Sequence, residues 1–268
     1  MKLAVLGSGS KGNALFVETD NINLLIDAGF SGKKIEEQLK KINIEICNID
    51  GILITHEHGD HIQGAGILSR KYDIPIYITK ESYEAGILKI GKIKDENLRF
   101  IEDAFWVGDS MVYPFDVMHD AERTIGFRIE ESSGSKVAIA TDLGYIDNTV
   151  REAFREVDVM VIECNYDYHK LMDCSYPWDL KARVKSRNGH LSNNDCARFI
   201  RESHHEKLKK VYLAHMSKDS NDPKLAIDAV LDELLRHNID ISVEIAQQDV
   251  CSKLIKFSEE LWRRLKNY

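Results

Sequence analysis

The 268 residues carry 44 Asp and Glu against 36 Lys and Arg, and this formal charge of −8 excludes a protein that binds a polyanion over its whole surface. No window approaches the roughly 20 apolar residues of a membrane span, and no charged leader precedes an apolar core, so we expect a cytoplasmic protein. The five cysteines form no CxxC pair and are expected to be reduced thiols. Because no Pro-, Gly- or Ser-rich linker divides the chain, residues 1–268 are expected to form a single domain.

Apolar periodicity predicts strands interspersed with helices along the chain. In chain order, the expected strands cover residues 2–6, 14–18, 23–26, 51–54, 76–79, 111–117, 124–130, 136–140, 158–162, 211–214 and 241–246. The expected helices cover residues 32–41, 60–71, 80–89, 147–155, 192–203 and 222–236. Strands in runs, with helices between and after them, predict an α/β (α+β) protein in which two mixed β-sheets pack face to face and helices cover them outside.

The most informative segment is residues 54–61, ITHEHGDH, at the end of an expected buried strand. Imidazole and carboxylate are the ligands that a borderline divalent metal prefers, and ordinary folding does not need them so close together. In an extended segment, His56 and His58 point to the same side. Asp60 and His61 then lie on the first turn of the next helix and face the same space, which predicts a site for two metals. The alternative is a His-rich solvated turn that binds nothing.

This motif resembles the HxHxDH signature of the metallo-β-lactamase-fold hydrolases, and the resemblance spans essentially the whole chain. It implies the four-layered αβ/βα sandwich of that family and a centre of two divalent ions, zinc or manganese. By this resemblance, one ion is held by His56, His58 and His119, the other by Asp60, His61 and His215, with Asp142 as the bridge and Asp27 supporting the metal loop.

Each of the ligands added by the resemblance ends an expected strand. His119 follows residues 111–118, Asp142 follows the apolar run 137–140, and His215 follows residues 211–214. A strand end fixes a side chain better than a free loop does, so this recurrence is the physical support for the assignment. For Asp142 alone, the alternative is an ordinary turn carboxylate.

Three polar segments point to one branch of the family. Residues 6–14 (LGSGSKGNA), 189–193 (GHLSN) and 214–221 (AHMSKDSN) are similar to the YycJ proteins of bacteria, also called WalJ, a branch associated with DNA exonuclease activity. The same half also resembles ribonuclease Z, a tRNA-processing endonuclease in which a Glu at a strand end and a His before a helix form a proton-donating pair. The matching positions here are Glu163 and His190.

The implied chemistry is hydrolysis of a phosphodiester. Asp60 is expected to orient the attacking water as well as to bind metal. His190 is expected to protonate the leaving oxygen, while Glu163 holds its other ring nitrogen and favours the charged form. The alternative for His190 is an unreactive residue just before a helix, because Ser192 is itself a plausible N-cap.

The glycine-rich loop of residues 8–13 is a candidate phosphate cradle that includes Ser8 and Ser10. Successive backbone N–H groups in such a turn can form an anion nest. The loop lacks the GxxxxGKS pattern, however, so a plain tight turn between two strands is the alternative.

A second candidate surface lies between residues 165 and 188, where cations are interleaved with Tyr and Trp. Cations for phosphates and aromatic faces for bases are what contact with a single strand requires. We take Lys181, Arg183 and Lys185 as the candidate phosphate contacts. The alternative is a solvated helix whose charges only keep it soluble.

The sequence therefore predicts a metal-dependent hydrolase whose partner is nucleic acid, with DNA preferred, and by resemblance a 5′→3′ DNA exonuclease. An RNA-processing endoribonuclease, a hydrolase of lactams, lactones or thioesters, and a non-catalytic binding protein of the same fold remain as alternatives. The Glu163 and His190 pair favours phosphodiesters. A binding protein would be expected to have lost metal ligands, and none is missing here. No oligomeric state is predicted.

Overall fold

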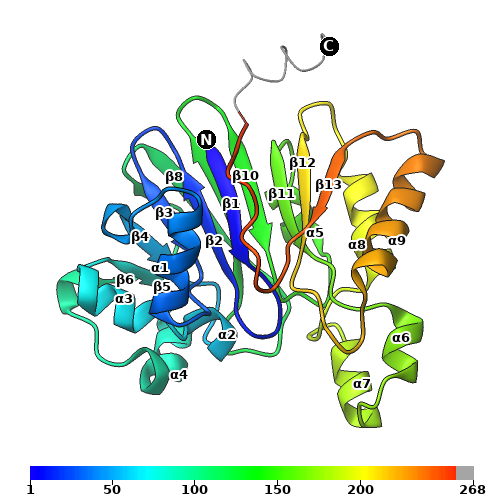
Figure 1. The fold of residues 1–268 in the computed structure, drawn as a ribbon, viewed down its shortest axis with the longest axis horizontal. Helices are drawn as coiled ribbons and strands as arrows, with labels where there is room; N and C mark the ends of the chain where they lie inside the picture. Colours follow the sequence, from blue (N-terminus) through cyan, green and yellow to red (C-terminus); the bar gives the residue numbers. More distant parts are fainter. Residues whose placement is uncertain (258–268) are drawn as a thin grey trace.

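Two seven-stranded β-sheets pack face to face in the computed structural model, which describes residues 1–257 (Figure 1). The first sheet runs antiparallel from β14 to β3 and parallel from β3 to β6. In spatial order, its strands are β14 (Ile255–Lys256), β1 (Lys2–Gly7), β2 (Ala14–Glu18), β3 (Asn23–Ile26), β4 (Gly51–Leu53), β5 (Ile76–Ile78) and β6 (Leu98–Phe100).

The second sheet repeats this plan, with antiparallel pairing from β7 to β10 and parallel pairing from β10 to β13. Its register pairs Glu163 with Ala214, so Glu163 and the residue after Ala214 emerge at the same edge. In spatial order, its strands are β13 (Ser242–Ile245), β12 (Lys210–Ala214), β11 (Val159–Glu163), β10 (Lys136–Ala140), β9 (Ile125–Glu131), β8 (Ser110–Asp116) and β7 (Phe105–Val107).

Helices cover the outer face of each sheet, which makes four layers (Figure 1). This arrangement confirms the predicted sandwich of two mixed sheets flanked by helices. The first sheet is covered by α1 (Gly32–Lys41), α2 (Gly59–Ile62), α3 (Ala65–Tyr72) and α4 (Lys80–Ile90). The second is covered by α5 (Asn148–Ala153), α8 (Asn193–Glu202) and α9 (Pro223–Arg236).

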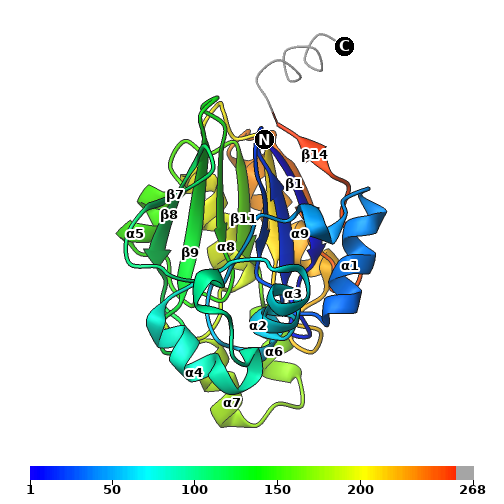
Figure 2. The ribbon, with the colours of Figure 1, turned by 90° about the vertical axis from the view of Figure 1, so that its left-hand side faces the viewer.

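Two further helices, α6 (Tyr168–Asp173) and α7 (Trp178–Val184), stand below the second sheet in Figure 1. Figure 2 shows α2 and α4 at this same end of the sandwich, with the N-terminus at the opposite end. Short 3₁₀ turns, η1 (Ile46–Asn48) and η2 (Asp95–Asn97), precede β4 and β6. The end that carries α2 and α7 is therefore bordered by segments from both halves of the chain.

Local sequence explains the elements around this end. Strand β11 is buried at every residue, because the parallel part of the sheet is covered on both faces and its strands are continuously apolar. Helix α8 begins at the predicted N-cap, where the Ser192 hydroxyl accepts the N–H of Asp195. Helix α9 begins with Pro223 in its first turn after the Asp222 cap, a position where the missing N–H of proline costs nothing.

The single helix expected over residues 60–71 is wrong. The chain forms α2 and α3 instead, with a break at Gly64. The N–H of Gly64 donates to the Ala28 carbonyl at 2.7 Å, and a Cβ there would lie 2.4 Å from the carbonyl oxygen of Phe30. The contact with the loop after β3 therefore interrupts the helix, and periodicity along residues 60–71 carries no sign of that loop.

Sequence patterning also missed the edge strands β6, β7 and β14 and the helices α6 and α7. These strands have three, three and two residues, too few for an alternating pattern. The equally short β4 and β5 were expected because they lie within the apolar segments at residues 51–54 and 76–79. Within residues 1–257, no helix has the length and apolar character needed to cross a bilayer. All five cysteines are free, as expected.

Gly29 allows three loops to meet beneath the lower end of the sheets. Its N–H donates to the Asn13 carbonyl at 2.9 Å, and a Cβ at this position would lie 1.6 Å from the carbonyl oxygen of Asp60. The Asp60 carbonyl also accepts the N–H of Asn13 at 2.8 Å. The loops after β1 and β3 therefore hold the backbone at the start of α2 in place.

We expect Gly29→Ala to lower the free energy of unfolding by about 1–3 kcal/mol, because the added methyl group overpacks this backbone contact. Urea denaturation measures the loss. Gly32→Ala is the matched control, since its nearest neighbour is the flexible end of Leu68 at 3.3 Å. We expect the control to change the free energy by less than about 1 kcal/mol. Equal losses in both variants would contradict the role given to Gly29.

Candidate metal centre

Histidine and aspartate side chains converge at the end of the sandwich that carries α2. Their potential ligand atoms form overlapping groups, and within each group all of these atoms lie within 4.8 Å of one another. The three groups that contain only predicted ligands are His56, His58 and His119; His56, His61 and Asp142; and Asp60, His61 and His215. The structure thus brings together all of the metal ligands expected from the sequence.

Three of the predicted residues take left-handed backbone conformations. The φ angles are 61° at Asp27, 54° at Asp142 and 51° at His215. Asp27 and His215 directly follow β3 and β12, and Asp142 is the second residue after β10. Such conformations are uncommon outside glycine and cost of order 1–3 kcal/mol each, so they persist where the surroundings hold them and cluster at functional sites.

The buried Asp27 carboxylate orients the first half of the cluster. It accepts the N–H of Thr55 at 2.8 Å and lies 2.7 Å from Nδ1 of His61. The Thr55 hydroxyl also contacts this carboxylate, at 2.9 Å, and lies 3.0 Å from Nδ1 of His56. With Nδ1 held from behind, each ring presents Nε2 to the cluster, which is the usual arrangement for a metal-binding histidine.

The second half is oriented in the same way by groups from the other sheet. Nδ1 of His119 lies 3.1 Å from the Gly189 carbonyl oxygen. Nδ1 of His215 lies 2.7 Å from Oε1 of the buried Glu163. Glu163 was expected to support only His190, so its contact with a predicted metal ligand is an addition made by the structure.

Several buried polar atoms at the cluster lack the partner that burial normally demands. Within the described residues, Nε2 of His56, Oδ2 of Asp142 and Nε2 of His215 form no hydrogen bond of acceptable geometry. Oδ2 of Asp142 lies 3.0 Å from Nε2 of His61, and Nε2 of His215 lies 3.5 Å from Oδ2 of Asp60. Most buried polar side-chain atoms are hydrogen-bonded, so unpaired atoms that share one space call for an explanation. Imidazole nitrogen and carboxylate oxygen are the donors of a divalent-metal site, and the residues present fit such a site.

The charges at the cluster favour a cation. Burial lowers the pKa of His61, but the Asp27 and Asp142 carboxylates raise it more, so it lies well above its ordinary value. Burial opposes protonation of His215 as well, yet Asp142 and Asp60 raise its pKa to about 10. In turn, the charges of these histidines outweigh burial and hold the pKa of Asp142 well below its ordinary value. Divalent cations would supply the positive charge that this field favours.

Glu163 joins the cluster to His190. Its Oε1 lies 2.8 Å from Nδ1 of His190, and its Oε2 accepts the N–H groups of Leu143 and Leu191 at 3.0 Å each. Burial lowers the pKa of His190, but the negative charge of Glu163 more than offsets this and raises it. The structure thus places the two predicted residues in direct contact, and Nε2 of His190 is left available for a proton transfer.

The glycine-rich loop braces the cluster. The buried hydroxyl of Ser8 donates to Oδ1 of Asn13 and accepts the N–H of His215, both at 2.8 Å. Nδ2 of Asn13 lies 3.1 Å from Nε2 of His61, a contact that no feature of the sequence indicated. The loop N–H groups that already donate to protein acceptors are those of Ser8, Gly9, Lys11, Gly12 and Asn13. These bonds favour the tight-turn alternative over a phosphate cradle at Ser8 and the exposed Ser10.

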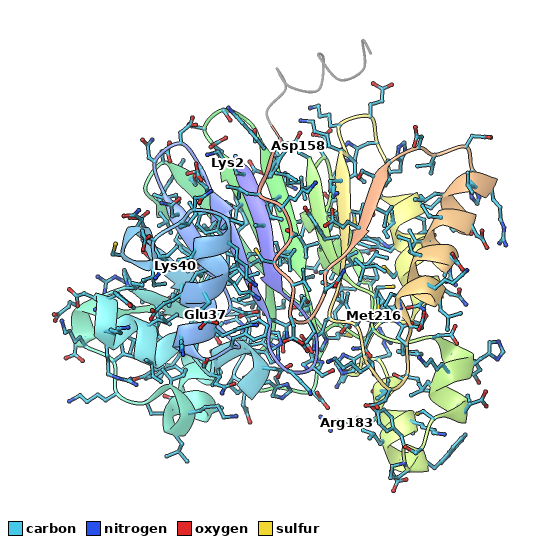
Figure 3. All side chains as sticks on the ribbon, in the orientation of Figure 1. Lys2, Glu37, Lys40, Asp158, Arg183 and Met216 are labelled. Carbon is cyan, nitrogen blue, oxygen red and sulfur yellow. The ribbon has the colours of Figure 1, made fainter. Side chains whose placement is uncertain are left out.

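The three cations predicted to contact phosphates differ in their surroundings. Lys181 is buried and its ammonium donates to the Met172 carbonyl, so the structure contradicts its assignment to a nucleic-acid surface. Arg183, labelled in Figure 3 beside α7, forms an ion pair with Asp120. Lys185 is exposed, with its ammonium 5.4 Å from the centre of the Trp178 ring. No helix was expected over these residues, and the rotation of α7 turns Lys181 toward the interior.

Comparison with known proteins agrees with this geometry. The profile of the family described as "Beta-lactamase superfamily domain" matches residues 22–216. The chain belongs to this superfamily. Among its members, exodeoxyribonuclease YycJ of Bacillus anthracis is 39% identical over 238 residues, which cover 87% of this chain and 90% of that protein. Exodeoxyribonuclease WalJ of Streptococcus pneumoniae is 36% identical over 252 residues, which cover 92% and 93%.

A solved structure supports the superfamily fold independently. The crystal structure of the metallo-β-lactamase fold protein YhfI from Bacillus subtilis matches with a TM-score of 0.69 over 94% of this chain and 99% of that one. At 17% identity, this likeness concerns the fold alone. The residues that the superfamily profile matches, 22–216, include every residue of the His and Asp cluster described above.

We expect Asp27→Asn to weaken the affinity for divalent metal by roughly 10- to 100-fold, because His61 and Thr55 lose the anion that orients them. Competition with a chromophoric chelator measures the affinity. Asp50→Asn is the matched control, since its exposed carboxylate accepts the N–H of Asn23 at the opposite ends of β3 and β4 from Asp27 and His56. Equal affinities in both variants would contradict the role given to Asp27.

Proposed function

We propose that this member of the superfamily is a two-metal phosphodiesterase that degrades DNA from its 5′ end. The observation that carries the proposal is the His190 and Glu163 pair, 2.8 Å apart, beside a cluster of metal-binding side chains. Hydrolysis of a phosphodiester needs both a cation to offset the phosphoryl charge and a proton for the leaving oxygen. The pair therefore supports a phosphodiester as the substrate.

The proposed ligands form two sets joined by Asp142. One set is His56, His58 and His119, and the other is Asp60, His61 and His215. When bound, two zinc or manganese ions would lower the pKa of a shared water toward neutrality and offset the charge on the phosphoryl oxygen. The unpaired buried atoms of Asp142, His56 and His215 support this assignment.

Glu163 and His190 have roles that do not require them to bind metal, and Asp60 has a second role besides its place among the ligands. Glu163 lies 2.8 Å from Nδ1 of His190 and raises its pKa, which favours the charged ring, in which Nε2 also carries a proton. His190 would then donate that Nε2 proton to the leaving oxygen. Asp60, whose carboxylate lies 3.5 Å from Nε2 of His215, would accept a hydrogen bond from the attacking water and orient it.

DNA as the substrate, and attack from an end, are proposed from the relatives. Two proteins named exodeoxyribonucleases match about nine tenths of this chain and of their own lengths. An RNA-processing endoribonuclease is the second candidate, since ribonuclease Z of Aeropyrum pernix is 35% identical over 97 residues. That match covers 31% of this chain, so it carries less weight.

Linear single-stranded DNA labelled at either end tests the proposal. We expect a 5′ label to appear at once in mononucleotides, while 3′-labelled strands shorten progressively. Asp142→Asn, which removes the proposed bridge, should abolish both patterns and serves as the control for contaminating nucleases. Cleavage of circular single-stranded DNA would contradict attack from an end. Cleavage of RNA with no cleavage of DNA would contradict the DNA exonuclease and support the endoribonuclease.

We expect His190→Ala to slow cleavage of an ordinary phosphodiester by roughly 10²- to 10⁴-fold, the usual contribution of a general acid. An aryl phosphodiester with a good leaving group needs little protonation, so its hydrolysis should slow much less. Comparison of the two rates at saturating metal gives the result. His204→Ala, at an exposed position, is the matched control and should leave both rates unchanged. Equal losses on both substrates would mean that His190 acts on metal or substrate binding instead.

A further inference from the structure

We propose that a cationic pocket between α5, α7 and α8 binds the DNA strand at a phosphate other than the one being cleaved. This inference rests on the proposed function and adds a second contact point for the substrate. The pocket has a volume of about 400 Å³. Its cations are Arg151, Lys185, Arg187 and Arg198.

The pocket has more positive than negative charge. Arg151 pairs with Glu202 at 2.7 Å, and Arg198 lies 3.4 Å from Asp195, so these two cations are balanced within the pocket wall. Lys185 and Arg187 have no carboxylate partner among residues 1–257. Because the chain as a whole has a formal charge of −8, two unbalanced cations in one hollow are a local exception that favours an anion.

Arg187 is held in an orientation suited to phosphate. Its guanidinium carbon lies over the Tyr145 ring, 4.0 Å from the ring centre, which is a cation–π contact. A guanidinium has five N–H donors, so a contact with an aromatic ring is compatible with paired hydrogen bonds to a phosphate. Lys185 lies over Trp178 and adds a second, more mobile cation at the same rim.

The pocket wall is continuous with the catalytic residues. Gly144 and Leu191 line the pocket, and they follow Asp142 by two residues and His190 by one. Since consecutive Cα atoms are about 3.8 Å apart, each lies within about 8 Å of its catalytic neighbour. The N–H of Leu191 also donates to Glu163. A strand whose scissile phosphate reaches Asp142 and His190 therefore passes close to this pocket.

Packing at Gly144 fixes the rim of the pocket. A Cβ at this position would lie 2.5 Å from the Arg187 carbonyl oxygen and 2.6 Å from that of Ser186. The absence of a side chain lets the segment after α7 rest directly on the loop that follows Asp142. Arg187 is thus attached to the catalytic loop, whereas Lys181 is buried and Arg183 is neutralised by Asp120.

Binding of phosphorothioate single-stranded DNA, measured by fluorescence anisotropy across a KCl titration, tests the pocket. A phosphate contact to single-stranded DNA contributes about 0.7 to the slope of log K against log salt. We expect Lys185→Gln combined with Arg187→Gln to make this slope shallower by about 1.4. Arg187→Lys keeps the charge but loses the paired hydrogen bonds, so it should weaken binding several-fold while the slope stays near that of the wild type.

The control for charge is Lys40→Gln combined with Lys207→Gln. Both residues are exposed. Lys40 is on α1 (Figure 3). Lys207 lies before the start of β12, and His215 follows the other end of that strand. This control should keep the wild-type slope. If the wild type binds and cleaves DNA, equal slopes for the pocket and control variants would contradict phosphate binding at the pocket and leave the proposed function intact. A wild type that neither binds nor cleaves any nucleic acid would overturn both.

Discussion

The buried carboxylate of Glu163 holds the catalytic end of the molecule together. It receives contacts from His190, His215 and the N–H groups of Leu143 and Leu191, which belong to three separate loops. A carboxylate removed from water costs several kcal/mol unless such partners satisfy it, so these loops are held where they can reach it. The placement of His215, of the proposed proton donor His190 and of the loop that lines the cationic pocket all depend on this single group.

Asp27 has the corresponding position in the first sheet. It is also fully buried at the end of a strand, and it orients the loop that carries His56 and His61 through Thr55 and Nδ1 of His61. The two sheets therefore each contribute one buried carboxylate that holds histidines from behind. Because Glu163 ends β11 and Asp27 directly follows β3, both carboxylates are held by the packed sheets, which position the ligand atoms between them.

The distribution of charge is compatible with the proposed polyanionic substrate. The formal charge of −8 repels DNA at long range, so in the proposed complex attraction comes from the bound metals and from nearby cations. Arg183 is paired with Asp120, and Lys181 is buried. Arg187 and Lys185 provide the unbalanced charge, beside the loop that carries His190. The proposed binding is thus concentrated beside the proposed site of cleavage.

The sequence by itself determined the parts of this protein that depend on neighbours along the chain. Residues 54–61 predicted a metal site, because histidines and aspartate this close together have few other uses. Each further predicted ligand followed an apolar strand. Most strands and helices followed from their periodicity, whereas β6, β7 and β14 were too short to show one. The break at Gly64 came from contact with the distant loop after β3.

Only the tertiary structure decided which groups meet across the chain. It joined Glu163 to His215, placed Asn13 beside His61, turned Lys181 inward and gathered Arg151, Arg187 and Arg198 around one pocket. Such contacts depend on sheet register and helix rotation, which a pattern of residue types leaves open. A ligand motif is local in the chain, but the partners of its side chains come from loops that only the packed sheets bring together.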